Sequence, residues 1–404
     1  MTMKVLYISP WVPASKGQDA GCMTFRSYME HMKQLEDVDL KLFSLVKKDI
    51  LDSSEVASES WIECAITKGG LLKNCERVLL DCIFAHRYPR AYFEGSSGYK
   101  GYCVKKELEK LRKRGWYPDI IQLETTEYAT MIDQVRLIFP DVSIVSSEHD
   151  VNFQSLERKM RQDNNEKKIR SYQLKKKLEL ESLRKADLIL VHNKKDYSLL
   201  IQEGIAEESV MQICPYYHRY NLNNRDVERG SILFWGAMNR KENYLAATWF
   251  IERVMPLLNN SFRLYVVGGN PPKELLDRAN DSVVVTGFVE DPTIYFTKCQ
   301  AMVVPLSLGA GIKVKVLEAM ASGIPVLTND IGIEGIPAVD GESYLHCECP
   351  EDYAAGLLNI LENEELESRL SNTGRKLTDT YFNLSSSHRD YSNYLKRLGD
   401  SERL

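Results

Sequence analysis

The chain has 404 residues, of which 44% are hydrophobic, and none of its apolar runs approaches the length of a membrane span. This composition predicts a soluble protein of two domains, and the formal net charge of −5 argues against nucleic acid as a general partner. The nine cysteines are scattered singly and no charged-then-apolar signal segment opens the chain, so a cytoplasmic protein with reduced thiols is expected.

Apolar runs and helical periodicity alternate through the first half of the chain. A strand is predicted at 4–9, followed by a loop and an amphipathic helix at about 23–35. Further strand-like runs, separated by helical segments, lie at 39–45, 119–123, 143–147, 187–191 and 210–213. Strands that alternate with helices are typical of an α/β domain with a parallel sheet.

Two polar residues lie at the ends of predicted strands in this half. His149 follows the strand at 143–147, and Glu124 follows the strand at 119–123. Ligands of open α/β sheets bind at the carboxyl ends of the strands, so both residues lie at the edge where a ligand would bind. Each also has a structural interpretation, because isolated histidines are often structural and Glu124 could cap the next helix.

The chain is unusually basic between residues 157 and 185, and a similar basic cluster spans 105–114. Leu174, Leu178 and Leu183 give part of the longer stretch an apolar stripe. A basic amphipathic helix of this kind could rest on an anionic membrane surface. A solvated helix face with intervening glutamates explains the same pattern.

The α/β pattern restarts after an Asn- and Arg-rich connection at about 215–230. Strands are predicted at 231–235, 263–267, 283–285 and 301–304, and helices at 350–361, 364–381 and 385–398. Turns with glycine follow the first three of these strands, at Gly236, at Gly268 and Gly269, and at Gly287. Since the carboxyl ends of parallel strands meet at one edge, the turns should converge on a single binding site.

The segment 301–329 combines a strand, a turn of small residues at 309–311, a helix and the start of another strand. Small residues at a helix start let backbone N–H groups approach an anion, and the helix dipole favours a phosphate there. Lys313 and Lys315 are expected in the first turn, where the dipole disfavours cations. An incoming anion would explain both lysines.

Glu318 is a carboxylate on the apolar stripe of the same helix. An acid on a core-facing stripe needs a partner. A hydroxyl group of a ligand would serve, and so would a buried arginine or a backbone group within the protein. The spacing alone leaves both interpretations open.

Residues 309–336, GAGIKVKVLEAMASGIPVLTNDIGIEGI, resemble the donor-site signature of family 4 glycosyltransferases, which are retaining enzymes of the GT-B fold. The resemblance implies two Rossmann-like domains with parallel sheets that face each other across an interdomain cleft. The expected domains are 1–213 and 214–384, with a terminal helix at about 385–404 that packs back on the first.

In that family a Glu-x7-Glu pair spans the turn and helix, and its second glutamate, which holds the nucleotide ribose, maps onto Glu318. The first position is Ala310, so recognition of the sugar ring departs from the family pattern. The chain is similar to a sub-branch that reads G-A-G-I-R/K-x-K-x-L-E-A, in which a basic residue such as Lys313 lies beside the phosphates.

The resemblance also assigns roles to other residues. His149, Lys241, Lys313 and Glu318 are the expected catalytic residues, with His149 near the donor sugar and Lys241 near the diphosphate. Contacts to the nucleotide sugar are expected from Gly21, Gly236, Arg240, Gly268, Gly269, Phe288, Val289, Gly309, Ala310, Gly311, Ile312 and Val314, and less surely from Gly17.

The implied activity is transfer of a sugar from a nucleoside-diphosphate sugar to a glycan, lipid-linked or protein acceptor, with retention of configuration. No metal-binding acidic pair of the Asp-x-Asp kind is evident at the expected donor site, so no metal and no cofactor are expected, and basic residues should take the place of a metal. A nucleotide-sugar epimerase or hydrolase of the same fold, or a catalytically inactive nucleotide-sugar binding module, are the alternatives.

Overall fold

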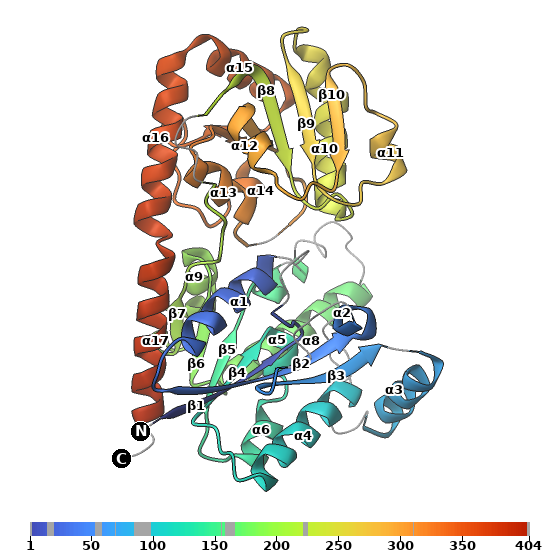
Figure 1. Ribbon diagram of the computed structural model, residues 1–404, viewed down its shortest axis with the longest axis vertical. Helices are drawn as coiled ribbons and strands as arrows, with labels where there is room; N and C mark the ends of the chain where they lie inside the picture. The colour runs from blue at the N-terminus through green and yellow to red at the C-terminus, as the bar shows by residue number, and fades with distance from the viewer. Residues whose placement is uncertain are drawn as a thin grey trace. The chain divides into compact units, whose positions relative to one another are not determined.

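The computed structural model describes residues 2–13, 20–52, 59–68, 70–84, 98–154, 156–157, 166–220, 225–309 and 311–401. Gly17 and Ala310, both singled out from the sequence, lie outside these residues. The chain divides into two compact units (Figure 1). Unit 1 comprises Met1–Cys214 and Leu384–Leu404, and unit 2 comprises Pro215–Asn383.

Unit 1 contains a parallel seven-stranded sheet with the order β3-β2-β1-β4-β5-β6-β7. Its strands are β1 (Met3–Ser9), β2 (Val38–Lys47), β3 (Ile62–Lys68), β4 (Ile120–Glu124), β5 (Ser143–Ser147), β6 (Leu188–Val191) and β7 (Val210–Gln212). Its helices are α1 (Ala20–Lys33), α2 (Lys48–Asp52), α3 (Leu71–Phe84), α4 (Gly98–Lys113), α5 (Thr126–Ala129), α6 (Ile132–Ile138), α8 (Glu166–Leu183), α9 (Lys194–Gln202) and α17 (Leu384–Ser401), with a 3-10 turn at Glu207–Ser209.

The sheet of unit 1 is buried on both faces because its strands are apolar on both sides. Along β1, Val5 and Tyr7 pack into a core with α1 and α17, whereas Leu6 and Ile8 pack into a second core with α4, α6 and α8. This alternation follows from the two-residue repeat of a strand. The last helix of the chain, α17, therefore forms part of the core of unit 1.

Unit 2 contains a parallel six-stranded sheet with the order β10-β9-β8-β11-β12-β13. Its strands are β8 (Glu228–Trp235), β9 (Arg263–Val267), β10 (Val283–Gly287), β11 (Cys299–Val304), β12 (Val326–Thr328) and β13 (Leu345–His346). Its helices are α10 (Lys241–Arg253), α11 (Lys273–Leu276), α12 (Thr293–Lys298), α13 (Val314–Ser322), α14 (Asp330–Ile333), α15 (Pro350–Glu362) and α16 (Glu364–Tyr381), with a 3-10 turn at Met255–Leu257.

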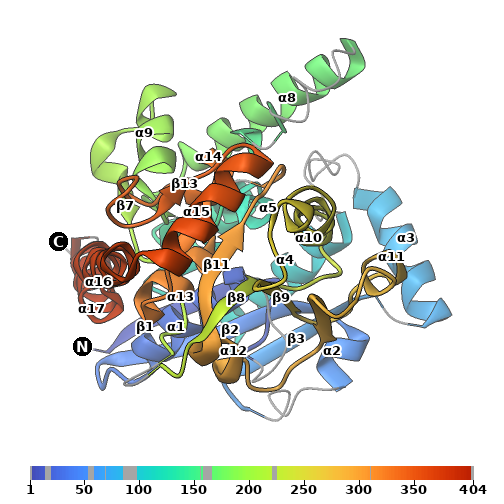
Figure 2. The ribbon, with the colours of Figure 1, turned by 90° about the horizontal axis from the view of Figure 1, so that it is seen from above.

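Helices cover both faces of the sheet in unit 2 as well. α12 and α15 both contact β8, and they lie on opposite faces of the sheet (Figure 2). The ring of Phe250 on α10 contacts that of Tyr353 on α15, and the ring of Trp235 at the end of β8 contacts that of Phe296 on α12. Two parallel sheets covered in this way confirm the predicted α/β class.

Both sheets reverse their strand order at one place, between β1 and β4 in unit 1 and between β8 and β11 in unit 2. In open α/β sheets, ligands bind outside the carboxyl ends of the strands at such a switch point. The fold therefore indicates one candidate position for a ligand in each unit.

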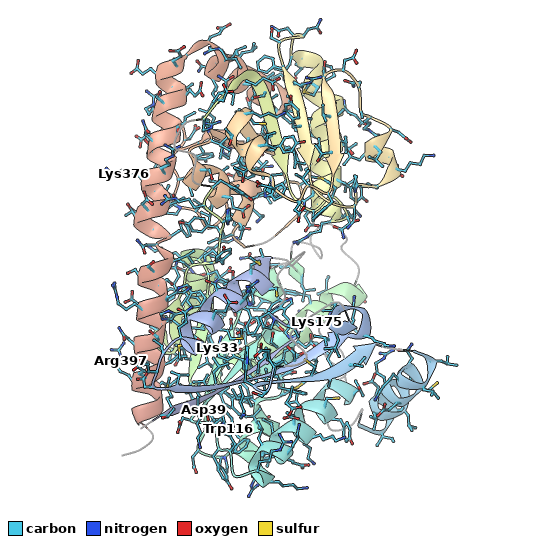
Figure 3. All side chains as sticks on the ribbon, in the orientation of Figure 1. Lys33, Asp39, Trp116, Lys175, Lys376 and Arg397 are labelled. Atoms are coloured by element: carbon cyan, nitrogen blue, oxygen red, sulfur yellow. The ribbon has the colours of Figure 1, made fainter. Side chains whose placement is uncertain are left out.

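Polar contacts also fix the amino edge of the sheet in unit 1. Trp116, which follows α4, donates from its indole Nε1 to Asp39 Oδ2 on β2 at 2.7 Å, and Figure 3 labels both side chains.

Among the described residues, no helix has the length and apolarity needed to cross a membrane.

Candidate functional site

The candidate site of unit 2 begins at two glycine turns that touch each other. Gly236 follows β8 with φ 153° and Gly268 follows β9 with φ 149°, a region that favours glycine. A Cβ on Gly268 would lie 1.7 Å from the carbonyl oxygen of Gly236, and a Cβ on Gly236 would lie 2.8 Å from Lys315 Nζ. Both positions therefore need glycine, and both lie at the carboxyl edge of the sheet.

Glu318 lies on α13 beside this edge, and its carboxylate has partners from two other segments. Oε2 accepts a hydrogen bond from Trp235 Nε1 at 2.9 Å, and Oε1 accepts one from the backbone N–H of His218 at 3.4 Å. Burial raises the pKa of Glu318 to about 7, although these hydrogen bonds and the charge of Lys315 oppose the rise. The backbone partner anticipated for a structural glutamate is present, but it does not offset the cost that burial places on the charged form of Glu318.

Lys315 was expected near an incoming anion but was not among the predicted site residues, and the structure places its amino group beside this sheet edge. Within the described part of the chain, its hydrogen-bond acceptor is Asn243 Oδ1 on α10 at 2.6 Å. Nζ also lies 5.5 Å from the centre of the Phe234 ring. Burial, followed by the charge of Arg240, lowers the pKa of Lys315 to about 7. An ammonium has three donors, so a ligand anion at this position would raise the pKa of Lys315 and accept hydrogen bonds from the charged form.

Lys313 differs from its prediction in position. Helix α13 begins at Val314, so Lys313 occupies the N-cap instead of the first turn. Its Nζ donates to the carbonyl oxygen of Gly311 at 2.5 Å and lies 3.7 Å from a carboxylate oxygen of Glu334. Both side chains of this ion pair are about nine-tenths buried, at 10% and 8% exposure. Lys313 thus also neutralises a buried carboxylate.

The remaining predicted residues of unit 2 lie around the same edge. The backbone N–H of Gly268 donates to the carbonyl of Gly287, and a Cβ on Gly269 would contact the ring of Phe288, which is 74% exposed. Arg240 pairs with Glu242 at 2.5 Å, and Lys241 is exposed at the first residue of α10. Gly309 has φ 132° beside the aliphatic chain of Lys313. Val289, Gly311, Ile312 and Val314 lie in the adjoining loops and helix start.

In unit 1 the carboxyl ends of three neighbouring strands bring together Glu124, His149 and His192. His149 Nε2 lies 3.0 Å from Glu124 Oε2, and His149 Nδ1 lies 3.3 Å from His192 Nε2. Glu124 is fully buried, and its hydrogen bonds run to Gln122 and His149, so it does not cap helix α5. His192 was not predicted from the sequence, although it follows β6 as His149 follows β5.

Two more buried carboxylates lie behind this group, and their partners identify them as structural. Glu179 accepts hydrogen bonds from the backbone N–H groups of Asn152 at 2.8 Å and Phe153 at 2.9 Å. Glu148 accepts one from Ser146 at 2.7 Å and one from Thr126. Gly21, predicted to contact a ligand, is half-buried in the first turn of α1.

One group of described residues places metal-ligating atoms close together. Ligand atoms of Asp330, His346 and Glu348 lie within 4.8 Å of one another after β12 and β13. Asp330 and Glu348 are exposed, and exposed acidic groups of this kind do not by themselves indicate a metal. All nine cysteines are free thiols.

Sequence comparison finds a family match within the second unit. Residues 229–363 match a family model described as glycosyl transferases group 1. A relative from Klebsiella pneumoniae, described as an uncharacterized 44.6 kDa protein in cps region, is 25% identical over 162 residues. That alignment covers 37% of this chain and 42% of the relative, so the match spans less than half of the relative's length.

Structural comparison covers nearly the whole chain. Sucrose-phosphate synthase from Thermosynechococcus elongatus matches with a TM-score of 0.71 at 15% identity, over 99% of this chain and 100% of that one. Anabaena Alr3699/HepE in complex with UDP matches with a TM-score of 0.67 at 12% identity, over 98% and 100%. Identities this low establish the fold alone, and the predicted GT-B architecture is confirmed. The match to glycosyl transferases group 1 lies within unit 2.

Proposed function

We propose that the protein transfers a sugar from a nucleoside-diphosphate sugar, bound by unit 2, to a hydroxyl group of a glycan, lipid-linked or protein acceptor, bound by unit 1. We further propose that the transfer retains the anomeric configuration and needs no metal. The arrangement of Glu318 and Lys315 at one sheet edge carries this proposal. Each has a pKa shifted to about 7 by burial, so each would gain from a polar ligand of the right charge.

The two groups match the two halves of a nucleoside diphosphate. A carboxylate accepts hydrogen bonds from the vicinal hydroxyls of a ribose, as Glu318 would. The Lys315 ammonium, with the amides near Gly236 and at the start of α13, would bind the diphosphate. The same donors would stabilise the negative charge that develops on the departing diphosphate in the transition state.

A donor screen tests the proposal directly. Alr3699/HepE has been solved with UDP and with UDP-glucose, so UDP-sugars are the first donors to test, followed by GDP-, ADP- and CMP-sugars. A matching donor should raise the melting temperature by mass action, and a mismatched one should not. If none of the donors shifts the melting temperature or is consumed, the proposed function is wrong.

Product analysis separates the proposed reaction from its alternatives. NMR of the anomeric proton in the product should show the configuration of the donor, which would establish retention. Release of free or epimerised sugar without an acceptor would identify a hydrolase or an epimerase. Donor binding without turnover for any acceptor would identify a binding module.

Transfer is expected to persist in EDTA, because basic residues and backbone amides provide the positive charge at the diphosphate site. The measurement is the initial rate with and without EDTA. The control removes one of the three residues whose ligand atoms lie close together, Asp330, His346 and Glu348. His346→Ala should leave the rate unchanged. Loss of activity in EDTA that magnesium or manganese restores would contradict the prediction, and the His346 variant would show whether this group is responsible.

Unit 1 is also proposed to associate peripherally with anionic membranes at the cytoplasmic face, where a lipid-linked acceptor would lie. On α8, Lys176 pairs with Glu203 and Lys177 with Glu181. These ion pairs neutralise part of the positive charge of the basic stretch, so it is a less suitable membrane contact. Helix α3 instead turns its apolar side outward and packs against basic α4. Its exposed apolar residues are Leu71, Leu72, Val78, Leu79 and Ile83, at 82%, 87%, 54%, 61% and 56%.

The membrane proposal predicts sedimentation with vesicles that contain phosphatidylglycerol, and weaker sedimentation with phosphatidylcholine alone. Leu72→Glu, on the exposed face of α3, should reduce vesicle binding and leave donor binding unchanged. If the wild type and the Leu72→Glu variant are recovered equally in the supernatant, α3 does not contact the membrane.

A further inference from the structure

A continuous chain of buried and partly buried hydrogen bonds crosses the sheet of unit 1 and ends at its carboxyl edge. It joins side chains from α17 and from four neighbouring strands, β1, β4, β5 and β6, or the residues that follow them. In order, the linked groups are Tyr7 OH, Tyr391 OH, Gln122, Glu124, His149, His192 and the carbonyl oxygen of Ile213. The distances along the chain run from 2.6 Å to 3.4 Å.

The last acceptor in this series of hydrogen bonds shows which atoms donate and which accept. A carbonyl oxygen only accepts, so the contact at 3.4 Å between His192 Nδ1 and Ile213 requires a proton on Nδ1 of His192. A neutral His192 then has its lone pair on Nε2, which can only accept from His149 Nδ1. His149 therefore carries a proton on Nδ1.

The opposite nitrogen of His149 completes the assignment. Its Nε2 faces Glu124 Oε2 at 3.0 Å, and Glu124 Oε1 accepts a second hydrogen bond from Gln122 Nε2 at 2.6 Å. A carboxylate only accepts hydrogen bonds, so an ionised Glu124 at this distance requires a proton on His149 Nε2. Both nitrogens of His149 then carry protons, and the ring is an imidazolium.

The groups that face the two rings explain why the proton rests on His149 and not on His192. Burial opposes charge on His149, but the hydrogen bond and charge of Glu124, with Asp150 and Glu148, outweigh it and raise its pKa. Burial and the neighbouring His149 lower the pKa of His192 to about 3. The ring of Trp11 lies against His149, with centroids 5.0 Å apart.

We propose that Glu124 and His192 are positioning residues that hold His149 as a fixed imidazolium. The inference rests on the proposed function. An imidazolium whose two N–H groups are engaged has no lone pair to take a proton.

Nitrogen NMR of ¹⁵N-histidine-labelled protein tests the protonation states without any need for activity. Spectra of His149→Gln and His192→Gln assign the two rings. The expected result at pH 7 is a doubly protonated His149 and a neutral His192 with its proton on Nδ1. A neutral His149, or a charged His192, would overturn the assignment whether or not the protein transfers sugar.

The pH dependence of turnover tests the role in catalysis, because a cation and a base have opposite signs. If the imidazolium is required, the rate should fall as pH rises through the raised pKa of His149. If His149 were a base, the rate should instead fall as pH drops through that pKa, and this outcome would overturn the proposal.

Variants of His192 test whether its hydrogen bond with His149 sets the pH dependence of turnover. His192→Leu removes the acceptor for His149 Nδ1–H, so the alkaline fall in rate should move about one pH unit lower. His192→Gln keeps an acceptor at the same reach and should restore most of the profile. His388→Gln is the control, since the ring of His388 stacks on that of His31 in the same unit and should not affect the profile. Identical profiles for the Leu and Gln variants would reject His192 as a positioning residue.

If no donor supports turnover but the NMR result holds, the proposed function fails and the protonation assignment stands. If transfer occurs and the NMR result does not hold, only the inference about His149 fails.

Discussion

Replacing Glu318 with glutamine is expected to weaken donor binding by roughly tenfold or more, because a charged acceptor for the ribose hydroxyls is lost. The same change should raise the melting temperature of the ligand-free protein at pH 8, by about 2 °C or more. The amide oxygen of glutamine can still accept from Trp235 Nε1, so the fold should be kept.

The sign of the stability change follows from the raised pKa of Glu318. The pKa of Glu318 is about 7 in the folded protein, against an ordinary value of 4.5. The protonated carboxyl group therefore contributes favourably to the free energy of unfolding, and this contribution is fully present below pH 4.5. It is lost as pH rises through 7, and at pH 8 the wild type holds a buried charge that the glutamine variant lacks. The stability difference between the two proteins should therefore disappear at low pH.

Thermal melts at several pH values, with and without donor, decide the matter. Glu179→Gln is a matched control, because burial raises the pKa of Glu179 to about 8 in the other unit. That variant can change stability but should leave donor binding unchanged. A Glu318 variant that binds donor as tightly as the wild type would remove Glu318 from the ribose site.

The fold could be predicted from the sequence because the central strands carry strong apolar runs. Strands such as β5 and β11 are buried on every residue and therefore stand out from the helices around them. The sequence analysis missed β3 and β13, which are the edges of the two sheets. β3 includes Glu63 and Lys68, and β13 has only two residues, so neither offers an apolar run.

The site could be predicted where one residue contradicted its surroundings. Glu318 on an apolar stripe is such a residue, and the structure places it beside Trp235 and Lys315. Lys315 shares its local sequence pattern with Lys313, and only packing against Asn243 and Phe234 distinguishes the two. His192 was not predicted because a single histidine at the end of a strand is often structural. Its signal was the parallel position of His149 after the neighbouring strand.

Lys315 supports a prediction about protons that a surface lysine would not. Burial lowers its pKa to about 7, so in the ligand-free protein at pH 8.5 the amine is mostly neutral. A bound diphosphate would bring negative charge to a buried site and raise that pKa. Donor binding at pH 8.5 should therefore take up close to one proton. Glu318, with a pKa of about 7, is already ionised at this pH and should contribute little.

Calorimetry in buffers of different ionisation enthalpy measures the proton uptake. Lys315→Met should bind donor without uptake and roughly hundredfold more weakly, since it leaves the phosphate without a buried cationic partner. Lys315→Arg keeps the charge at every pH and should bind without uptake. Lys298→Met is the control for loss of one charge in unit 2, because Lys298 lies over the ring of Tyr265, 3.6 Å from its centre. Uptake that persists in the methionine variant would show that Lys315 does not bind the diphosphate.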